Sequence, residues 1–318
     1  MKTQKIRKIA AIGGGTGLFS ILSGLRDDFD VTAIVTMADD GGSTGVLREE
    51  FGILPPGDIR RALVALSTAD NEMLAKLFSY RFERGGGLNG HSFGNLMIAA
   101  LERLTGSFAA AVKEAEKILA VRGRAVPVTL QSASLIARLA DGRVVKGETN
   151  IDVPKHDGHL KIEKIWLEPK PKANPEAVRA ITSADAVIIG PGDLFTSLIP
   201  NLLVPEVRRA VVATKAKKIY FVNLMTKFGE TTNFRASDFL KTLEDYLGKG
   251  VLDFVVVNSK KPTIARLKKY ATQKSNLVVC DGENLSGRPV LATADLIRPH
   301  GFVRHDARKV AKIIRMRV

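Results

Sequence analysis

The sequence of 318 residues is 45% hydrophobic and 25% charged, a balance that excludes collagen-like, low-complexity and disordered chains. Its single cysteine, Cys280, excludes a disulfide framework and a zinc site built from thiolates. The formal net charge of +15 first favours a nucleic acid, an anionic lipid or a phosphorylated molecule as the partner.

The N-terminal part of the chain alternates between short apolar runs and segments with helical spacing. Residues 7–12 and 31–37 are rich in β-branched and other apolar side chains, which is typical of buried parallel strands. Apolar residues then recur every three to four positions, which predicts helices over residues 18–25, 59–67, 73–82, 92–104 and 108–121.

The pattern changes over residues 123–170. Polar and apolar residues alternate there, and Asp141-Gly142 lies between two short runs as a hairpin signal. We therefore expect a small antiparallel β insertion at 123–170.

Strands and helices alternate again after this insertion. We expect strands at 186–189, 219–223, 254–258 and 277–280, and a basic amphipathic helix at 303–314. This alternation predicts a Rossmann-like, doubly wound α/β fold, in which a mostly parallel sheet carries helices on both faces. We expect residues 1–318 to form this one domain, with the β insertion inside it.

The positive charge is concentrated at the two ends of the chain. Residues 1–8 carry four basic and no acidic side chains, and residues 260–318 carry fourteen basic and four acidic ones, which leaves a net charge of +1 on the 251 residues between. The basic C-terminal segment has only two aromatic residues, Tyr270 and Phe302, and no recognisable nucleic-acid-binding module. A nucleic-acid partner is therefore disfavoured.

The sequence gives no membrane signal. It has no run of about 18 apolar residues, and Gly13 interrupts the apolar run near the N-terminus, with no cleavage site after it. We expect a cytoplasmic protein without a membrane span.

The loop after the first expected strand is rich in glycine: Gly13, Gly14, Gly15, Thr16 and Gly17. Glycines let a backbone approach a phosphate, and the N-terminus of the following helix can then bind it. The spacing matches neither the strict dinucleotide fingerprint nor the P-loop. The alternative is a turn that only packs a helix against a strand.

Two further loops follow strands at the same expected edge of the sheet. Asp39 and Asp40 could bind a ribose hydroxyl, hold Mg²⁺, act in acid–base chemistry or cap a loop, and the residues leave these alternatives open. The third loop contains Gly192 and Asp193, and Thr196 and Ser197 after it suit phosphate or hydroxyl contacts.

Residues 90–94 match the G-x-S-x-G pattern of serine hydrolases around Ser92, but no strand precedes them. A Ser92, Asp281 and His305 triad is therefore disfavoured. We expect Ser92 to cap a helix whose N-terminus faces a ligand, and His91 to donate a hydrogen bond to an anionic group.

Two residues of the basic C-terminal segment stand out. Arg304 lies at the expected start of the last helix, where a cation opposes the helix dipole, so we expect it to bind an external anion. Tyr270 ends a basic helix and is expected to stack on a base.

Five motifs closely resemble those of the gluconeogenesis factor family, bacterial relatives of 2-phospho-L-lactate transferase. The resemblance runs from residue 7 to about residue 310. The motifs are Ile12-Gly-Gly-Gly-Thr-Gly, Ala38-Asp-Asp-Gly-Gly-Ser-Thr-Gly, Pro55-Pro-Gly-Asp-Ile-Arg, Leu88-Asn-Gly-His-Ser-Phe-Gly-Asn and Gly190-Pro-Gly-Asp-Leu-Phe-Thr-Ser-Leu-Ile-Pro-Asn-Leu-Leu-Val-Pro.

The resemblance implies a Rossmann-like protein that binds a nucleotide sugar such as UDP-N-acetylglucosamine and is needed for normal cell shape during growth on gluconeogenic carbon sources. It further implies cell-wall synthesis proteins as partners, and it allows a homo-oligomer. The alternative is a Mg²⁺-dependent enzyme resembling 2-phospho-L-lactate transferase, which acts on a nucleotide diester donor and a deazaflavin acceptor.

Ligand-cleft residues carry over from the family by motif. Two positions depart from it: Asp193 stands where we expect serine, and the Gly-Pro-Ser-Asn-Pro loop of the transferases is absent, which disfavours transfer activity. The extra carboxylate would weaken anion binding unless Mg²⁺ or a hydroxyl meets it. The residues carried over are Gly13, Gly14, Gly15, Thr16, Gly17, Asp39, Asp40, Asp58, His91, Ser92, Asn95, Gly192, Thr196 and Ser197, with Tyr270 and Arg304 as nucleotide-sugar contacts; Asp39 and Asp40 are the candidate catalytic and metal-binding residues.

Overall fold

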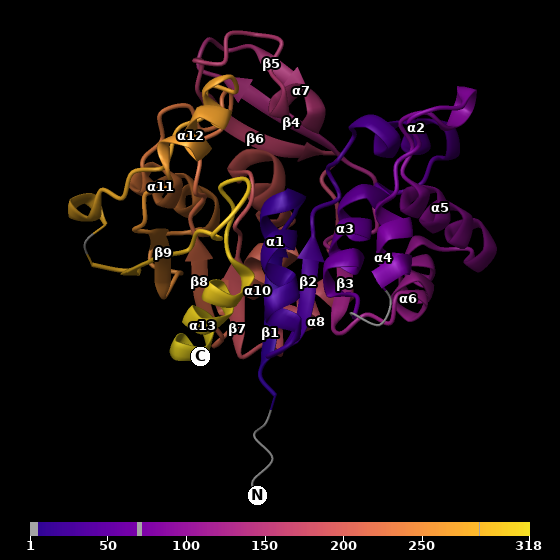
Figure 1. Cartoon of the computed structure of the whole chain (residues 1–318), viewed down its shortest axis with the longest axis horizontal. Coiled ribbons are helices and arrows are strands. Elements are labelled where there is room, and N and C mark those ends of the chain that lie inside the picture. The colour runs from indigo at the N-terminus through magenta and orange to yellow at the C-terminus, as the bar shows by residue number, and fades with distance from the viewer. Residues whose placement is uncertain (1–5, 69–71, 286) are drawn as a thin grey trace, which may run out of the picture.

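A computed structural model describes residues 6–68, 72–285 and 287–318. Its main element is a seven-stranded sheet with helices on both faces, and a separate three-stranded sheet lies beyond the carboxyl ends of several of its strands (Figure 1). The four basic residues of the N-terminal segment are at positions 2, 5, 7 and 8. Positions 2 and 5 lie outside the described residues.

All seven strands of the main sheet are parallel. Their spatial order is β3-β2-β1-β7-β8-β9-β10, so the chain builds outward from β1 in one direction and then restarts at β7 on its other side. This is the order of a Rossmann-type sheet, with a topological switch point between β1 and β7, where such folds bind ligands. The strands are β1 (Lys8–Gly13), β2 (Asp30–Val35), β3 (Arg124–Pro127), β7 (Ala186–Ile189), β8 (Lys217–Phe221), β9 (Phe254–Asn258) and β10 (Val290–Ala294).

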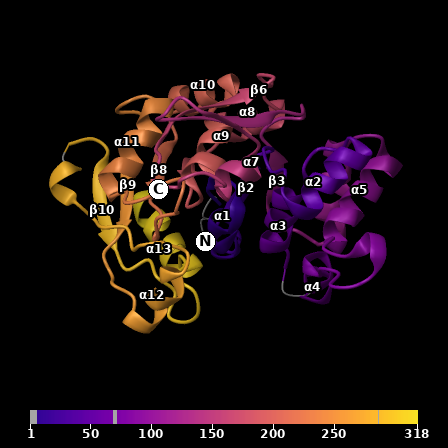
Figure 2. The same cartoon turned by 90° about the horizontal axis from the view of Figure 1, so that it is seen from above.

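The helices form two layers and a lateral lobe (Figure 2). One layer contains α1 (Gly15–Arg26), α3 (Pro56–Leu66), α12 (Ile264–Ala271) and α13 (Ala307–Arg317). The opposite layer contains α8 (Pro175–Thr182), α9 (Ile199–Leu202), α10 (Pro205–Ala213) and α11 (Ala236–Leu247). Beyond β3, the lobe contains α2 (Gly42–Phe51), α4 (Glu72–Ser79), α5 (Phe93–Thr105) and α6 (Phe108–Ile118).

The small sheet confirms the antiparallel insertion but narrows its bounds. It has the order β5-β4-β6, with β4 at Ser134–Leu139, β5 at Val144–Lys146 and β6 at Ile162–Glu168. The expected hairpin is present, because Gly142 has a φ of +87° and its N–H donates to the carbonyl of Leu139. Residues 124–127 are not part of it: β3 pairs in parallel with β2 and forms the edge of the main sheet.

Two other expectations were wrong in detail. Residues 277–280 are not a strand, since only Leu277 forms an isolated bridge, with Met225. The last strand is β10, an edge strand at Val290–Ala294 that the apolar pattern did not reveal. The final helix starts at Ala307 rather than 303, because the Asp306 carboxylate accepts hydrogen bonds from the backbone N–H groups of Arg308 and Lys309 and so caps it.

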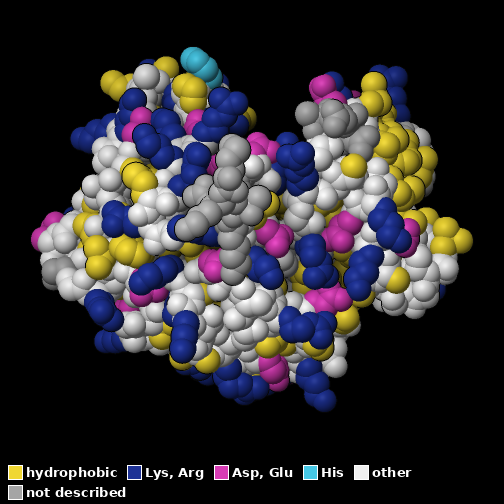
Figure 3. Space-filling view, turned by 90° about the horizontal axis from the view of Figure 1, so that it is seen from below, with side chains coloured by type: hydrophobic (Ala, Val, Ile, Leu, Met, Phe, Trp, Pro, Cys, Tyr) yellow, Lys and Arg dark blue, Asp and Glu magenta, His cyan; other side chains and the backbone are white. Residues whose placement is uncertain are grey.

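Charged side chains are mixed on the surface. On the face seen in Figure 3, lysine and arginine side chains are scattered among acidic ones rather than gathered in one stripe. Within the described residues, no helix is both long enough and apolar enough to cross a membrane.

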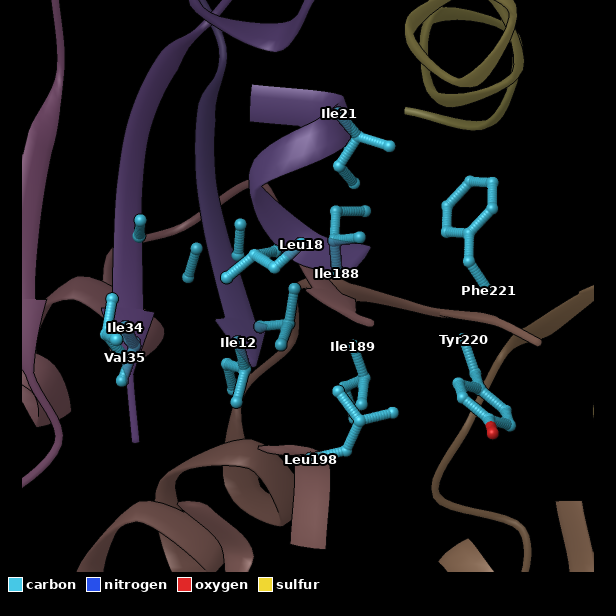
Figure 4. Packing of buried hydrophobic residues seen from close by; sticks show 14 of the residues in the cluster. Ile12, Leu18, Ile21, Ile34, Val35, Ile188, Ile189, Leu198, Tyr220 and Phe221 are labelled. Carbon is cyan, nitrogen blue, oxygen red and sulfur yellow. The ribbon is translucent and has the colours of Figure 1, made fainter. Parts of the chain in front are cut away.

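Buried side chains pack against both faces of the central strands and hold the carboxyl ends of these strands in place. Ile12 of β1, Ile34 of β2 and Ile189 of β7 are fully buried, and Leu18 and Leu198 pack against them from the two sides (Figure 4). Because both faces are covered, these strands are apolar throughout instead of alternating. The loops that follow β1 and β7 are therefore held between rigid layers.

Candidate functional site

Three cavities meet at the carboxyl ends of β1 and β7, and Thr16, at the N-terminus of α1, lines all three. The acidic cavity, of about 390 Å³, lies toward β2 and the insertion and is lined by Asp39, Asp58, Glu148, Asp152 and Asp193, among others. The tyrosine cavity, of about 380 Å³, is lined by Gly17, Gly192, Asn223, Tyr270, Phe302 and Arg304. The arginine cavity, of about 590 Å³, is lined by Arg60, Arg61, Arg298, Arg304 and Arg308.

The first glycine loop brings three segments into close contact. A Cβ atom on Gly14 would lie 2.6 Å from Asp58 Oδ2, and one on Gly17 would lie 2.7 Å from the carbonyl oxygen of Pro191. Gly15 has a φ of +60°, and its N–H donates to Asp58 Oδ2 at 2.9 Å. Close packing therefore accounts for the glycines, and Asp58 already meets one amide at the start of α1.

Asp58, in the first turn of α3, is a buried carboxylate that faces the first glycine loop. Burial raises its pKa to about 6, although Arg61, whose Nη1 lies 3.2 Å from Asp58 Oδ1, lowers it, and the charge of Asp39 raises it further. A carboxyl group in this state can hold or release a proton near neutral pH.

Asp39 and Asp40 face different parts of the protein. Asp39 lines the acidic cavity and accepts a hydrogen bond from the N–H of Gly41 at 3.0 Å. Asp40 accepts hydrogen bonds from the N–H groups of Glu148 and Thr149, at 3.0 and 2.8 Å, at the start of the short helix α7 (Glu148–Asp152). Asp40 therefore fastens the insertion to the main domain, and Asp39 is the one that a ligand in the acidic cavity would meet.

A lysine that the sequence did not single out organises the far wall of the acidic cavity. Lys227 Nζ forms ion pairs with Asp152, with Asp193 at 2.9 Å and with Glu230 at 3.4 Å. Burial would lower the pKa of Lys227, but these three carboxylates raise it above its ordinary value. Asp193 is thus met by an ammonium group, which resolves the departure from the family motif without Mg²⁺ or a hydroxyl.

Glu230 and Glu148 complete this wall. The Glu230 side chain is fully buried, its pKa is raised by burial, and it accepts a hydrogen bond from the hydroxyl of Thr196 at 3.1 Å. Burial, followed by the charges of Asp152 and Asp39, raises the pKa of Glu148 to about 9. Thr196 therefore binds protein rather than standing free for a phosphate, whereas Ser197 lies beside Gly15 at the cavity.

A buried polar network supports the cavity from behind. Asn95 donates to the hydroxyl of Ser43 at 3.2 Å and accepts from Arg60 Nε at 3.0 Å. His91 Nδ1 lies 3.2 Å from the same Ser43 hydroxyl. The acidic cavity is lined by Asn95, Ser43 and Arg60. His91 is buried and does not line the cavity itself. Its expected contact with a ligand would pass through Ser43.

Ser92 does not cap its helix with its side chain. It occupies the N-cap position of α5, but its hydroxyl donates to the carbonyl of Phe78 at 3.3 Å. The end of α4 supplies that acceptor, which competes with the first turn of α5. A hydrolase triad is also absent from the described residues, since the Asp281 carboxylate is bonded to Ser237 and Asn284.

The tyrosine cavity brings Tyr270 and Arg304 together with the third loop. The Tyr270 hydroxyl accepts a hydrogen bond from the N–H of Val303 at 2.9 Å. The same hydroxyl donates a hydrogen bond to the carbonyl oxygen of Val303 at 3.3 Å. The exposed Arg304 guanidinium lies 5.6 Å from the centre of the Phe302 ring. Since Asp306 caps α13, Arg304 lies ahead of the helix and its charge faces the cavities.

The oxygen donors of the acidic cavity suit a hard cation such as Mg²⁺. Among the described residues, Asp152, Asp193 and Glu230 form the one group of three acidic side chains with oxygens within 4.8 Å of one another, and Lys227 already pairs with all three. Asp39 and Asp58, whose charges interact, are the remaining pair near Thr16 that could hold a cation.

Known proteins resemble this chain over nearly its full length. A family model described as 2-phospho-L-lactate transferase CofD matches residues 9–295. A relative from Aquifex aeolicus is 47% identical over 96% of this chain and 95% of its own. The protein named gluconeogenesis factor in Bacillus subtilis is 43% identical, and the one in Halalkalibacterium halodurans is 42% identical, with coverage of 96% or more of each chain.

Solved structures confirm the fold. A crystal structure of a Bacillus halodurans protein superposes with a TM-score of 0.93 at 41% identity and covers 98% of this chain and 99% of that one. A second crystal structure, described as a member of the UPF0052 family, gives a TM-score of 0.92 at 40% identity with the same coverage. The seven-stranded parallel sheet and the small antiparallel sheet are therefore features of a known architecture.

Proposed function

Because the chain belongs to the 2-phospho-L-lactate transferase CofD family, and is a homologue of its gluconeogenesis factors, we propose that it is a regulatory protein that binds a nucleotide sugar. The ligand class is that of UDP-N-acetylglucosamine. Through this ligand the protein would adjust cell-wall synthesis, and hence cell shape, to growth on gluconeogenic carbon sources, with cell-wall synthesis proteins as its partners.

The position of the tyrosine and acidic cavities carries this proposal. They lie side by side at the switch point between β1 and β7 and share Thr16 and Asp193. Rossmann-type folds bind nucleotides at this point because strand ends and helix N-termini converge there. A nucleotide sugar consists of a base, a diphosphate and a neutral sugar in that order. The base would lie in the tyrosine cavity, the diphosphate at the N-terminus of α1, and the sugar in the acidic cavity.

Each cavity offers the matching chemistry. Tyr270 and Phe302 supply aromatic surface for a base, and Arg304, which forms no ion pair with the part of the chain that the structure describes, supplies a guanidinium for the diphosphate. Asp39 supplies a carboxylate that can bind sugar hydroxyls. The carboxylates disfavour a phosphate in the acidic cavity itself and favour an uncharged sugar there.

Calorimetric titration tests the proposal. We expect UDP-N-acetylglucosamine to bind with one-to-one stoichiometry, and Arg304→Ala to weaken its affinity by about tenfold or more, as expected for a charge-assisted hydrogen bond. Lys312→Gln, which removes one charge from an exposed position of α13, is the control. Absence of binding by UDP-N-acetylglucosamine, UDP-glucose and GDP, with and without Mg²⁺, would contradict the proposal.

The interacting pair Asp39 and Asp58 favours a second candidate function, group transfer from a nucleotide diester. An acceptor hydroxyl would attack the distal phosphorus, the bond to the nucleoside monophosphate would break, and Asp58 would take the acceptor's proton. Mg²⁺, when bound, would neutralise phosphate charge. Mass spectrometry of donor, deazaflavin acceptor and Mg²⁺ tests this candidate, and the lack of both nucleotide release and coupled product would exclude it.

A further inference from the structure

We propose that the arginine cavity is a second ligand site, distinct from the nucleotide-sugar cleft, which binds a small phosphorylated metabolite of the sugar-phosphate class. Its volume of about 590 Å³ falls in the range of small-molecule sites. It opens between α1, α3, the end of α4 and the start of α13, and Thr16, Arg60 and Arg61 separate it from the acidic cavity, since they line both.

The charge of this cavity is unbalanced. Five arginines line it, and Asp306, the one carboxylate among its described lining residues, accepts hydrogen bonds from the first amides of α13. Arg61 pairs with Asp58, but within the described residues no carboxylate forms an ion pair with Arg60, Arg298, Arg304 or Arg308. Several unpaired guanidinium groups around one hollow favour a multiply charged anion such as a phosphate ester.

Arg60 shows that the cationic wall is built into the fold rather than lying loose on the surface. Only 7% of Arg60 is exposed, and its hydrogen bonds go to the neutral acceptors Asn95 and Phe78. Burial and the charges of Arg61 and Arg81 lower the pKa of Arg60 to about 10. A buried cation with neutral partners is costly, and an anion bound in the cavity would offset that cost.

The rest of the lining suits the body of a sugar. Phe19, Val64, Ala65 and Ala307 give apolar surface, against which the C–H face of a sugar can pack. The hydroxyls of Thr16, Ser20 and Ser79 add neutral hydrogen-bonding groups.

A buried histidine in the wall between the arginine and tyrosine cavities has an unused acceptor. Burial lowers the pKa of His305 to about 4, so the ring is neutral, and its bonded partner is the backbone of Val222. Its Nε2 is buried and forms no hydrogen bond with the described residues. The wall shared by the two cavities thus holds a neutral ring that adds no positive charge to the five arginines.

The position of the arginine cavity suits a second ligand molecule rather than a further part of the nucleotide sugar. The acidic and tyrosine cavities already provide for base, diphosphate and sugar, whereas the arginine cavity branches from Thr16 toward α3 and α4. It shares Arg304 with the tyrosine cavity, so occupancy of one site would change affinity at the other, and the effect would be reciprocal.

Titration with glucose 6-phosphate, with glucose and inorganic phosphate as controls, tests the proposal. We expect one equivalent of glucose 6-phosphate to bind more tightly than either control, and to bind also when UDP-N-acetylglucosamine is saturating, with an apparent Kd changed no more than about tenfold. An apparent Kd that rises in proportion to UDP-N-acetylglucosamine would show one shared site and overturn the proposal, as would binding no tighter than that of inorganic phosphate.

Two variants place the ligand in the cavity. Arg308→Gln removes an exposed guanidinium from the start of α13, and Ser79→Trp fills the rim at the exposed end of α4 without changing charge. Each should weaken glucose 6-phosphate binding by about tenfold and leave UDP-N-acetylglucosamine binding within about threefold. Lys312→Gln, on the same helix but outside the cavity, should change neither.

The outcomes separate this site from the proposed function. Unchanged glucose 6-phosphate binding in both variants would overturn the second site, whatever the nucleotide sugar does. Glucose 6-phosphate binding by a protein that binds no UDP-sugar would support the second site while contradicting the proposed function.

Discussion

The acidic and arginine cavities share Thr16, Arg60 and Arg61, yet they differ in how the protein treats its own charge. In the acidic cavity, Lys227 and Arg61 pair with carboxylates, so the wall is largely neutralised from within. In the arginine cavity, most of the guanidinium groups have no such partner among the described residues. The contrast teaches that local pairing, and not the net charge of +15, decides which cavity wall keeps a positive charge.

The two cavities also differ in their origin along the chain. The acidic cavity gathers residues from position 15 to position 227, including the insertion, whereas the arginine cavity joins α1, α3 and α4 to residues 298–308. Among the described residues, the basic C-terminal segment thus lines the arginine cavity and not the acidic cavity. Four substitutions test this division, starting with the one that should have the largest effect.

Lys227→Met removes the cation that neutralises the acidic cavity. We expect a loss of about 4 kcal/mol in the free energy of unfolding at pH 8, because Glu230 stays buried without its cationic partner. The loss should be smaller at pH 5, where the burial-raised pKa of Glu230 lets it take up a proton. Urea unfolding at both pH values measures it, with Lys241→Met on an exposed position of α11 as the control. An equal loss in both variants would contradict the pairing.

Gly17→Ala pushes apart the loops after β1 and β7, both of which line the acidic and tyrosine cavities. The added Cβ would lie 2.7 Å from the carbonyl oxygen of Pro191 and 2.8 Å from Gly192, which are backbone atoms that cannot yield easily. We expect a loss of about 3 kcal/mol in the free energy of unfolding. Gly86→Ala, where a Cβ would meet nothing within 4 Å, should change it by less than about 0.5 kcal/mol. A tolerated Gly17→Ala would show that the loops do not need this contact.

Glu148→Gln tests the electrostatic cost of the acidic cavity. The pKa of Glu148 is raised from 4.5 to about 9 in the folded protein, so the folded state keeps a proton that the unfolded chain loses. Stability from this group is full below pH 4.5 and falls as the pH rises toward 9, by at most about 1.4 kcal/mol per pH unit.

Between pH 6 and pH 8, the unfolding free energy of the original protein should therefore fall by about 1–2 kcal/mol more than that of Glu148→Gln, after allowance for solvent screening. Glu163→Gln, at an exposed position of β6 in the same insertion, should keep the original slope. Parallel pH profiles for the original protein and Glu148→Gln would mean that Glu148 is ionised throughout this range.

Most of the fold could be predicted from sequence because its main strands are covered on both faces. Residues 186–189 and 254–258 form β7 and β9 with the predicted bounds, since continuous apolar runs bounded by polar loops have few other solutions. The edges were harder. Residues 124–127 look like part of an alternating sheet because β3 has one neighbour, and β10 is only partly buried, so its apolar pattern is weak.

The candidate site could be predicted only where a motif carries it. The glycine loops, Asp39 and Arg304 stand in recognisable surroundings, and the structure brings them to one sheet edge. Lys227 could not be found this way, because two of its three partners lie 34 and 75 residues away and their meeting depends on how the insertion folds back. Arg60 ends the Pro-Pro-Gly-Asp-Ile-Arg motif, but nothing local predicts its burial against α5, which is a tertiary effect.

Tyr270→Phe tests how the C-terminal segment holds Arg304 in position, and it should have the smallest effect of the four substitutions. The hydroxyl of Tyr270 accepts from the N–H of Val303, next to Arg304, and its loss should cost about 1 kcal/mol of unfolding free energy. The aromatic ring stays, so UDP-N-acetylglucosamine binding should weaken only a few-fold, through a less well-positioned Arg304. Calorimetry measures it, with Tyr80→Phe at an exposed position as the control. A loss as large as that of Arg304→Ala would instead mean that the hydroxyl itself contacts the ligand.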